Sequence, residues 1–493
     1  MVKDIYDRIC EGVEVRTNLI ALKKEISEES KKRSLAYLLE GNYSILVSLL
    51  ENSDPKVRKN AALILGEMED EDLKEALLRA YQRETQRFVR TSYLKALEHY
   101  EYRDCLSVLK EQLSSLEAWA PSAEEEKHWR EEMATLRRMV FRYEKPSKHT
   151  FIGYRERAEV ILLTNRGYRE ITSKQLPEGE IKMLAGGIRL VTEDLRKILS
   201  IRTYSQLLFP IKGTRLISPK PEEAASQLAE SDLLPFLKRM HRGSAPFYYR
   251  IELKSQMPLE QKSQFLKKLT ARLDLLTESE LLNMPGWYEV EVRLVENKDG
   301  RFIPLMRLCT LEDERFSYRK HALASSIAPV NGALFMELAK PYLTEGAQVL
   351  DPFCGVGTML IERSRCKKAD PLYGIDIYEE AVQKGRENAR TAGVIIHFIN
   401  RDFFDFQHEY LFDEIVSNLP GVTRTKDKQE IRRLYQRLFE KSSQVLKRGG
   451  LMLLYTTEPD LLQDCIRRET RYRILEKWVI VEREGHTLFA IRG

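Results

Sequence analysis

The residues best suited to chemistry lie in one short stretch, from Asp351 to Glu362. Gly355 and Gly357 lack a Cβ atom, so the backbone can turn sharply there and approach a ligand closely. The apolar residues before Asp351 predict the end of a buried strand, and Thr358 begins a helical pattern. Because the first N–H groups of a helix have no partner within it, they face the space beside the turn. These features predict a ligand-binding turn between a strand and a helix.

A second acidic residue strengthens this prediction. Asp376 lies 25 residues after Asp351 and ends the apolar stretch 372–376. A carboxylate at the end of the second strand suits a ribose diol, whose two hydroxyl groups need acceptors. The alternative is an ordinary strand–helix–strand unit that binds no nucleotide.

The segment Asp-Pro-Phe-Cys-Gly-x-Gly-Thr-x-Leu-Ile-Glu at 351–362 resembles the first motif of class I S-adenosylmethionine-dependent methyltransferases. More narrowly, it resembles the RNA guanine-N2 methyltransferases that carry a THUMP domain, and this resemblance extends over roughly residues 155–493. It implies S-adenosyl-L-methionine as the cofactor, with residues 325–331 beside its methionine end and Asp376 and Ile377 at its ribose. The residues implied at the cofactor turn are Asp351, Pro352, Phe353, Cys354, Gly355, Gly357 and Thr358.

The implied cofactor site is completed by a pair of residues that follow the third predicted strand, 394–399. In this fold an acid here accepts a hydrogen bond from the adenine amine, and its neighbour packs against the ring. Asp402 and Phe403 occupy these positions. A helix N-cap role for Asp402 or Asp405 is the alternative, since Asp is a preferred capping residue.

The fourth predicted strand, 412–417, ends at Asn418-Leu419-Pro420, where amine methyltransferases of this class carry Asn/Asp-Pro-Pro-aromatic. An exocyclic amine conjugated to a purine is a poor nucleophile. Accepting its hydrogens with the Asn418 side-chain oxygen and the next backbone carbonyl concentrates electron density on nitrogen. We therefore predict Asn418, Leu419 and Pro420 as the catalytic residues, in a reaction that requires no metal, and Asn418 is predicted to contact the cofactor as well.

The chain departs from the family pattern at this motif. Leu419 replaces the first proline, and Gly421 stands where an aromatic residue would stack on the flipped base. Such stacking is worth roughly 1–3 kcal/mol. Phe404 or Tyr435 would have to compensate, or the domain is a weakened or inactive methyltransferase.

Residues 1–142 have a helical pattern with little glycine and resemble HEAT repeats. The best matches are 54–66 and 87–97, with a weaker one at 33–38. Repeats of this kind need stacked neighbours to bury their apolar faces. The preferred interpretation is an interaction solenoid with a protein partner, and direct RNA contact is the alternative. The densely charged stretch 114–139 predicts a solvated helix that joins two domains.

The middle of the chain, 146–320, changes to a mixed α and β pattern. Strands are predicted at 159–164, 187–191, 247–253 and 288–295, with helices at 169–176, 192–199 and 259–276. This succession resembles the ferredoxin-like segment and the THUMP-like module, at 215–320, of the same methyltransferase family.

Positive charge is concentrated in this middle region. Residues 146–320 hold 30 Lys+Arg and 23 Asp+Glu, a net charge of +7, whereas the whole chain carries +5. Cations beside Phe247, Tyr248 and Tyr249 predict a surface that follows phosphates and stacks bases. RNA is therefore the expected partner, tRNA before rRNA. The predicted RNA-binding residues are Arg215, Lys238, Arg239, Arg242, Arg315, Tyr318, Arg319 and Arg424.

The predicted fold is multidomain: all-α HEAT-like repeats at 1–142, an α+β ferredoxin-like and THUMP-like region at 146–320, and an α/β Rossmann-like class I methyltransferase domain at 321–493. The sequence contains no run of about 18 apolar residues, so no membrane span is predicted. The six scattered cysteines fit a reducing cytoplasm.

The function predicted from the sequence is an S-adenosylmethionine-dependent RNA methyltransferase that forms N2-methylguanosine in tRNA. The alternative is a catalytically weak or inactive protein that keeps the fold for RNA binding or assembly. Methylation of a protein or of a small-molecule amine is a third interpretation, and the basic middle region disfavours it.

Overall fold

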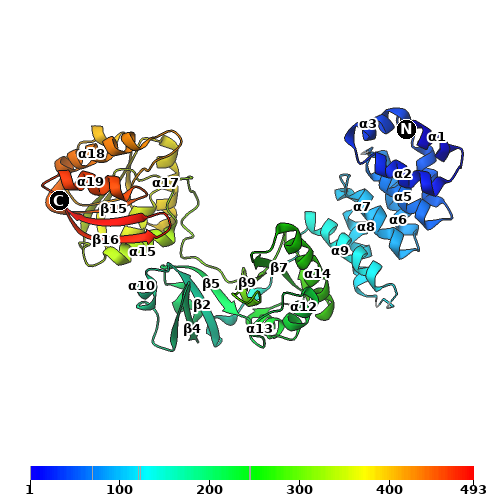
Figure 1. Ribbon diagram of the computed structural model, residues 1–493, viewed down its shortest axis with the longest axis horizontal. Coiled ribbons are helices and arrows are strands. Elements are labelled where there is room, and N and C mark those ends of the chain that lie inside the picture. Colours follow the sequence, from blue (N-terminus) through cyan, green and yellow to red (C-terminus); the bar gives the residue numbers. More distant parts are fainter. Residues whose placement is uncertain (1, 69, 120, 123, 244–245) are drawn as a thin grey trace. The chain divides into compact units, whose positions relative to one another are not determined.

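The computed structural model describes residues 2–68, 70–119, 121–122, 124–243 and 246–493. The chain divides into two compact units, Met1–Ser147 and Lys148–Gly493. The first unit is built of helices and the second contains the extended sheets (Figure 1).

Stacked helices form the first unit. Asp54 caps α5 (Pro55–Gly66) by accepting a hydrogen bond from the Lys56 amide, and Pro55 occupies the first helical position. Helices α2, α5, α7 and α9 pack against one another in that order. The helices of this unit are α1 (Val2–Cys10), α2 (Val15–Glu25), α3 (Glu29–Leu39), α4 (Ser44–Ser48), η1 (Leu49–Glu51), α5, α6 (Asp72–Arg83), α7 (Arg87–Leu97), η2 (Arg103–Cys105), α8 (Leu106–Glu117) and α9 (Glu126–Tyr143).

The stretch 114–139 is not a solvated linker helix, which corrects the sequence prediction. It contains the end of α8 and most of α9, and α9 packs on the repeats through Met133, Leu136 and Met139. Glu132 is fully buried and accepts hydrogen bonds from Arg90 and Tyr81. The apolar residues recur at helical spacing between the charges, and the high charge content concealed this periodicity.

Among the described residues of the second unit, one eight-stranded sheet runs in the order β3-β4-β2-β5-β10-β9-β7-β8. Strand β5 joins its two halves by pairing with β10, at Leu305 with Pro210 and Met306 with Phe209. A two-stranded sheet pairs β1 with β6. The strands are β1 (Thr150–Phe151), β2 (Ala158–Thr164), β3 (Ile181–Leu184), β4 (Gly187–Thr192), β5 (Tyr204–Pro210), β6 (His241–Arg242), β7 (Phe247–Lys254), β8 (Leu281–Asn283), β9 (Val290–Glu296) and β10 (Phe302–Leu308).

Several predicted elements of this region are confirmed, with shifted ends. The predicted helix 259–276 is α14, whereas the one predicted at 192–199 begins only at Leu195, because Asp194 caps it. Strands β3, β8 and β10 were not predicted. The helices of this region are η3 (Gly153–Arg155), α10 (Arg169–Ser173), α11 (Leu195–Leu199), α12 (Pro221–Ala229), α13 (Leu233–Met240) and α14 (Leu259–Leu276).

The last part of the chain forms a seven-stranded sheet, within the described residues, in the order β13-β12-β11-β14-β15-β17-β16. Neighbours from β13 to β15 are parallel, and β17 is antiparallel to both β15 and β16. The strands are β11 (Ala347–Asp351), β12 (Ala369–Asp376), β13 (His397–Asn400), β14 (Phe412–Asn418), β15 (Leu446–Thr456), β16 (Arg473–Val481) and β17 (His486–Arg492).

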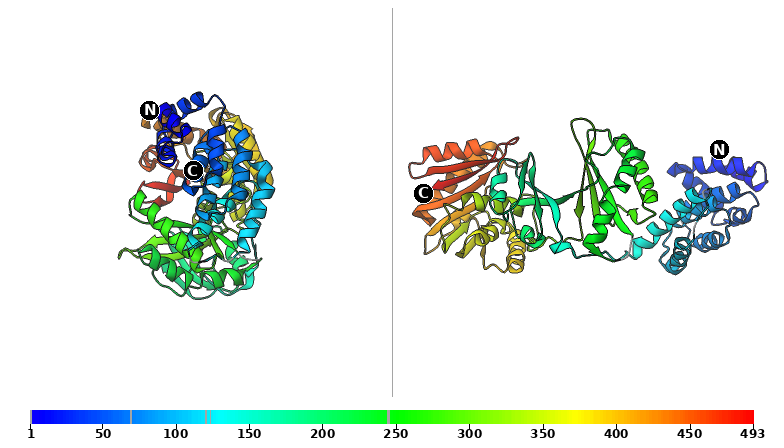
Figure 2. Two further views of the ribbon diagram at one scale, coloured as in Figure 1. Left: turned by 90° about the vertical axis from the view of Figure 1, so that its right-hand side faces the viewer. Right: turned by 90° about the horizontal axis from the view of Figure 1, so that it is seen from below.

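Helices cover both faces of this sheet (Figures 1 and 2). One apolar core includes residues of α15, α16 and α17, and a second one includes residues of α18 and α19. The right-twisted parallel strands therefore end at one common edge, where the loops meet. The helices are α15 (Pro329–Ala339), α16 (Thr358–Cys366), α17 (Glu379–Ala392), η4 (Phe403–Asp405), α18 (Lys428–Val445) and α19 (Pro459–Arg468).

One boundary in this sheet domain differs from the prediction. The third strand begins at His397 rather than at 394. Within the described ranges, no helix combines the length and the apolar character that crossing a membrane requires.

Candidate functional site

The glycine turn after β11 has a left-handed backbone, which glycine adopts readily. Gly355 has φ +52° and Gly357 has φ +80°, both in the left-handed region. A Cβ atom added to Gly357 would lie 2.9 Å from the Phe398 ring. One added to Gly355 would meet nothing within 4 Å. Gly357 is therefore required by packing, whereas Gly355 borders open space.

Asp376, at the end of β12, holds this turn. Its Oδ2 accepts a hydrogen bond from the Gly355 amide at 2.9 Å, and its Oδ1 accepts one from the Tyr378 amide at 3.0 Å. Ile377, the next residue, is 55% exposed. An exposed large apolar side chain beside a carboxylate suits a ligand that has both hydroxyl groups and an apolar ring.

Asp351 lies beneath the turn, at 1% exposure. Its Oδ1 accepts hydrogen bonds from the Ser417 hydroxyl, at 2.6 Å, and from the Phe353 amide, at 3.1 Å. Burial raises the pKa of Asp351 to about 7, and the charge of Asp376 acts in the same direction. Asp351 thus ties β11 to β14. Ser417 was missed by the sequence reasoning, although a hydroxyl residue in an apolar strand is a recognisable signal.

Thr358, the first residue of α16, has a buried Oγ1 with no hydrogen-bond partner in the described part of the chain. An unsatisfied buried hydroxyl is costly, so it points to a missing ligand. Together with open space at Gly355, it fits the polar methionine end of the implied cofactor. Burial raises the pKa of the Cys354 thiol well above its usual value, which keeps this thiol unreactive. Pro352 is buried and Phe353 partly exposed.

Asn418 ends β14, which pairs in parallel with β11, so it lies at the same sheet edge as the glycine turn. Its Nδ2 donates a hydrogen bond to the Ser325 carbonyl at 3.2 Å. This contact orients the amide and leaves Oδ1 as an acceptor. Leu419 is anchored through its amide, which donates to the Tyr455 carbonyl at 2.9 Å. The Pro420 carbonyl accepts a hydrogen bond from Tyr435.

Gly421 has a packing reason in this structure. A Cβ atom there would lie 2.1 Å from Thr457 Oγ1, so the Thr457 side chain takes the space that a larger residue would need. Tyr435 cannot replace the missing aromatic residue, because it is fully buried and its hydroxyl is bonded to Pro420 and Thr456. Phe404 is partly exposed, with the Arg437 guanidinium 3.8 Å from its ring centre.

The capping role considered for Asp402 is observed. Its Oδ1 accepts a hydrogen bond from the Phe404 amide at 2.9 Å and caps η4, while the residue stays exposed. Phe403 is 1% exposed and its ring belongs to the core. The adenine contacts of Asp402 and Phe403 therefore remain predictions.

Most of the predicted RNA-binding cations lie on the surface. Lys238 forms an ion pair with Glu280, and the Arg239 guanidinium lies 5.2 Å from the centre of the Phe236 ring. Arg319 is partly exposed, with a buried Nε that has no partner among the described residues. The exposed residues of the set are Arg215, Lys238, Arg239, Arg242 and Arg424.

Arg315 and Tyr318 require a correction, because both are buried. Arg315 pairs with Asp313, donates to the Ile201 and Tyr204 carbonyls and stacks on the Tyr204 ring at 3.6 Å. The Tyr318 hydroxyl donates to Glu362 at 2.6 Å. Because both side chains are buried and bonded inside the protein, neither residue presents a surface to RNA. Glu362 also accepts two hydrogen bonds from Arg202, a junction that the sequence did not reveal.

The predicted base-stacking aromatics require a correction as well. Phe247, Tyr248 and Tyr249 are 3%, 7% and 0% exposed, and the Tyr249 hydroxyl donates to Asp274. They begin β7, which has neighbours on both sides in the sheet, so their rings pack in the interior.

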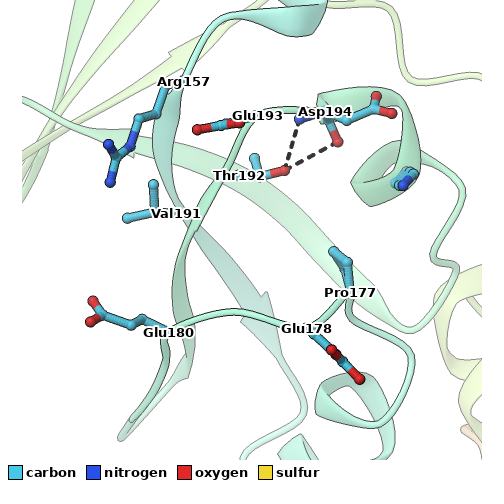
Figure 3. Close-up of a pocket in the computed structure, with 9 residues that line it drawn as sticks. Arg157, Pro177, Glu178, Glu180, Val191, Thr192, Glu193 and Asp194 are labelled. Carbon is cyan, nitrogen blue, oxygen red and sulfur yellow. Dashed lines mark hydrogen bonds between the residues drawn. The ribbon is translucent and has the colours of Figure 1, made fainter.

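A hollow of about 380 Å³ in the middle region does not suit RNA either (Figure 3). Thr192 and the Asp194 backbone are joined by hydrogen bonds at its rim. Four carboxylates outnumber two cations around it, so it repels phosphate. It is lined by Arg157, Pro177, Glu178, Glu180, Val191, Thr192, Glu193, Asp194 and Lys197.

Comparison with known families identifies two parts of the chain. Residues 318–484 match the model described as RMKL-like, methyltransferase domain, and residues 43–120 match HEAT repeats. The predictions of helical repeats in front and of a class I methyltransferase-like fold at the end are thereby confirmed.

Individual relatives support the same assignment. The tRNA (guanine(6)-N2)-methyltransferase of Thermus thermophilus is 31% identical over 30% of this chain and 45% of its own. The tRNA (guanine(10)-N2)-dimethyltransferase of Methanothermobacter thermautotrophicus is 26% identical over 36% of this chain and 54% of its own. This chain therefore spans about half the length of these curated relatives.

The crystal structure of TrmN from Thermus thermophilus has a similar fold, with a TM-score of 0.51 and 20% identity, over 68% of this chain and 98% of TrmN. These relatives and the glycine turn indicate S-adenosylmethionine as the cofactor. Residues 318–484 are thus similar to methyltransferase domains that use S-adenosylmethionine, and the same chain carries a match to HEAT repeats at 43–120.

Proposed function

We propose that this chain is an RNA methyltransferase that methylates the exocyclic amine, N2, of a guanine in tRNA. The observation that carries the proposal is the Asn418 amide. It stands at the same sheet edge as the glycine turn, and its contact with Ser325 leaves Oδ1 to accept a hydrogen bond. Two relatives that act on guanine N2 of tRNA support the choice of substrate.

The residues at the end of β14 act on the nucleophile. Asn418 Oδ1 and the Leu419 carbonyl accept the two hydrogens of the amine and turn its lone pair toward the methyl donor. S-adenosylmethionine, when bound, supplies an electrophilic methyl group on a sulfonium. The amine loses its proton to solvent, and Tyr435 keeps the loop in place through the Pro420 carbonyl.

Residues around the turn hold the donor. Thr358 and the free N–H groups of α16 bind its polar methionine end above Gly355. Asp376 accepts from the ribose hydroxyl groups, for which its oxygens have further lone pairs, and Ile377 lies against the nucleoside. Asp402 and Phe403 are assigned to the adenine.

The middle region supplies RNA binding in this proposal. Residues 215–320 act as a THUMP-like module, and its exposed cations Arg215, Lys238, Arg239 and Arg242, with Arg424 from the methyltransferase domain, contact phosphates. The net charge of +7 over 146–320 supports this role.

The test is direct. The purified full-length chain is incubated with isotopically labelled S-adenosylmethionine and unmodified tRNA transcripts, and the nucleosides are then resolved by mass spectrometry. Labelled N2-methylguanosine is the expected product. Label only in protein, or only in another nucleoside, would refute the assignment to guanine N2.

A second candidate is a protein that binds the cofactor and RNA but transfers methyl groups poorly. The absence of an aromatic side chain at Gly421 favours it, since Thr457 occupies that space and Tyr435 is buried. Calorimetry with S-adenosylhomocysteine separates the two. Binding of this product without turnover on any tRNA transcript would establish the second candidate.

A further inference from the structure

Charge is strongly segregated within the helical repeat unit. Residues 1–147 hold 25 Lys+Arg and 28 Asp+Glu, a net charge of −3. Helices α2, α5 and α7 together hold nine cations and one acid, a net charge of +8. The remainder of the unit therefore carries −11. If the charges were only there to keep the surface solvated, positive and negative residues would not need to be separated between neighbouring helices.

These three helices form one continuous layer. Helix α5 lies between α2 and α7 and packs on both. At α5 and α7 the backbones nearly touch, because a Cβ atom on Gly66 would lie 2.6 Å from the Ala96 Cα. The close approach brings the outward stripes of adjacent helices near to one another.

On each helix, some of the cations lie on a stripe outside the buried face, at helical spacing. On α2 the stripe contains Arg16 and Lys24, on α5 it contains Lys56 and Lys59, and on α7 it contains Lys95. We call these five residues the basic ridge. Among the described residues no acid forms an ion pair with any of them, whereas Arg58 and Arg90 of the same helices pair with buried Glu84 and Glu132. The ridge cations are thus available to a partner.

A hollow of about 520 Å³ runs along the ends of this layer. Lys23 enters it from α2 and donates a hydrogen bond to Asn60 of α5. Its acids are already engaged, since Glu98 pairs with Arg138 and Glu67 with Lys32. It is lined by Lys23, Ile26, Ser27, Leu63, Glu67, Lys95, Ala96, Glu98, His99 and Arg138.

We propose that the basic ridge of α2, α5 and α7 is a second RNA-binding surface, which holds the phosphate backbone outside the methyltransferase domain. The charge alone points to a polyanion. Four of the five ridge residues are lysines, which are flexible point charges suited to following phosphates and lack the bidentate geometry that favours carboxylate recognition. Ile20 of α2, at 47% exposure, is a large apolar side chain exposed beside the ridge, and most of the side chains that line the hollow are polar, so a protein helix would find few apolar anchors there.

The choice of RNA among polyanions rests on the proposed function. The argument that the ridge binds a polyanion rests on its charge alone. An acidic protein segment is the competing occupant. The ridge would also replace the sequence-based preference for a protein partner at these repeats.

The experiment uses the full-length chain and a fluorescent tRNA transcript. Binding is measured by anisotropy between about 50 and about 300 mM salt, a range over which salt increasingly screens exposed charges. The ridge variant is Lys56→Ala/Lys59→Ala/Lys95→Ala. The matched control is Arg33→Ala/Arg79→Ala/Lys110→Ala, which removes the same charge from exposed positions on α3, α6 and α8. Circular dichroism verifies that both variants fold.

The ridge variant is expected to bind tRNA about tenfold more weakly, with a salt slope smaller by about two, since each phosphate contact contributes roughly 0.7–0.9. The control should stay within about twofold of the parent protein. Equal affinity and slope for ridge variant and parent would overturn the proposal. Equal losses in ridge and control variants would do so too, because net charge alone would then explain them.

Two further readouts separate the alternatives. If the parent protein binds polyglutamate through the ridge but binds tRNA equally well with or without it, the partner is acidic protein and the RNA proposal fails. Uptake of S-adenosylmethionine, measured by calorimetry, should be the same in the ridge variant. If the parent protein itself binds no S-adenosylmethionine, the proposed reaction is refuted, whereas the result on RNA binding by the ridge still stands.

Discussion

Helix α16 has two consecutive turns with opposite polar behaviour. In the first, the Thr358 hydroxyl is buried without a partner in the described part of the chain. In the second, Glu362 accepts hydrogen bonds from Tyr318 and Arg202, and Arg363 forms a fully buried ion pair with Glu414. Both turns are buried, so burial alone does not explain the difference.

The difference shows how one helix serves two purposes. A buried donor or acceptor without a partner costs about 1–3 kcal/mol, so a ligand that supplies the partner gains from it. A saturated cluster has nothing left to offer a ligand and instead fixes the protein's own parts. The unsatisfied Thr358 hydroxyl is therefore on the side of α16 where we propose that the cofactor binds, and the satisfied groups mark the contact with Arg202 of the middle region.

The largest effect is expected at the saturated turn. Glu362→Ala should lower the free energy of unfolding by about 3 kcal/mol, because it leaves Arg202 and the Tyr318 hydroxyl without their partner. Denaturant unfolding measures this, and Glu362→Gln, which keeps an acceptor for Tyr318, should lose less. A change below about 1 kcal/mol in the alanine variant would contradict the structural role.

The unsaturated side is tested most strongly at Asn418. Asn418→Ala should reduce the rate of methyl transfer about 100-fold, since it removes the acceptor for the amine. Affinity for S-adenosylmethionine should change little, because the amide faces the nucleophile. Single-turnover assays and calorimetry measure the two quantities. Unchanged turnover would show that this strand end does not touch the reacting amine.

The pH dependence of stability tests whether Asp351 belongs with the satisfied structural groups or with the groups that face the ligand. Its folded-state pKa, about 7, is above the ordinary value of 3.8, so the folded protein binds this proton more tightly than the unfolded chain does. This contribution to stability is complete below the unfolded pKa and is lost as the pH rises through 7. Between about pH 5 and pH 7 the loss amounts to about 2 kcal/mol.

In Asp351→Asn, which cannot titrate but keeps an acceptor for Ser417, the unfolding free energy should depend less on pH over this range. Denaturant titrations at several pH values compare it with the parent protein. Identical pH profiles would mean that the carboxyl is hydrated and ionised, and so belongs with the ligand side.

The smallest effect is expected at Thr358. Thr358→Val should weaken S-adenosylmethionine binding by about fivefold, equivalent to about 1 kcal/mol for one hydrogen bond. The cofactor-free protein should be as stable as the parent or more so, because the variant removes an unsatisfied group. Thr358→Ser retains the hydroxyl and serves as the control. A destabilised valine variant with normal affinity would reverse the interpretation of this turn.

Backbone-determined features were predictable from the sequence. Gly355 and Gly357 announce the left-handed turn, and Asp54-Pro55 announces the start of α5, because few other residues allow these conformations. The strand ends that carry Asp376 and Asn418 followed from apolar runs. The glycine turn and the strands on either side of it were therefore accessible without coordinates.

Side-chain environment was not predictable in the same way. Arg315 and Tyr318 look like surface residues in a charged segment, yet contacts more than 40 residues away along the chain, with Ile201 and Glu362, draw them into the interior. Phe247, Tyr248 and Tyr249 resemble a half-exposed strand, but β7 lies between β8 and β9. Thr457, which explains Gly421, gives no local signal at all.

The pairing of β5 with β10 has a practical consequence for dissecting the protein. Because one continuous sheet spans both halves of the middle region, a cut near residue 215 would strip β10 of a neighbour and leave its backbone groups as an open edge. Fragments that end there are expected to self-associate. The division between Ser147 and Lys148 crosses no strand pair, and it is the natural place to separate the repeats from the remainder.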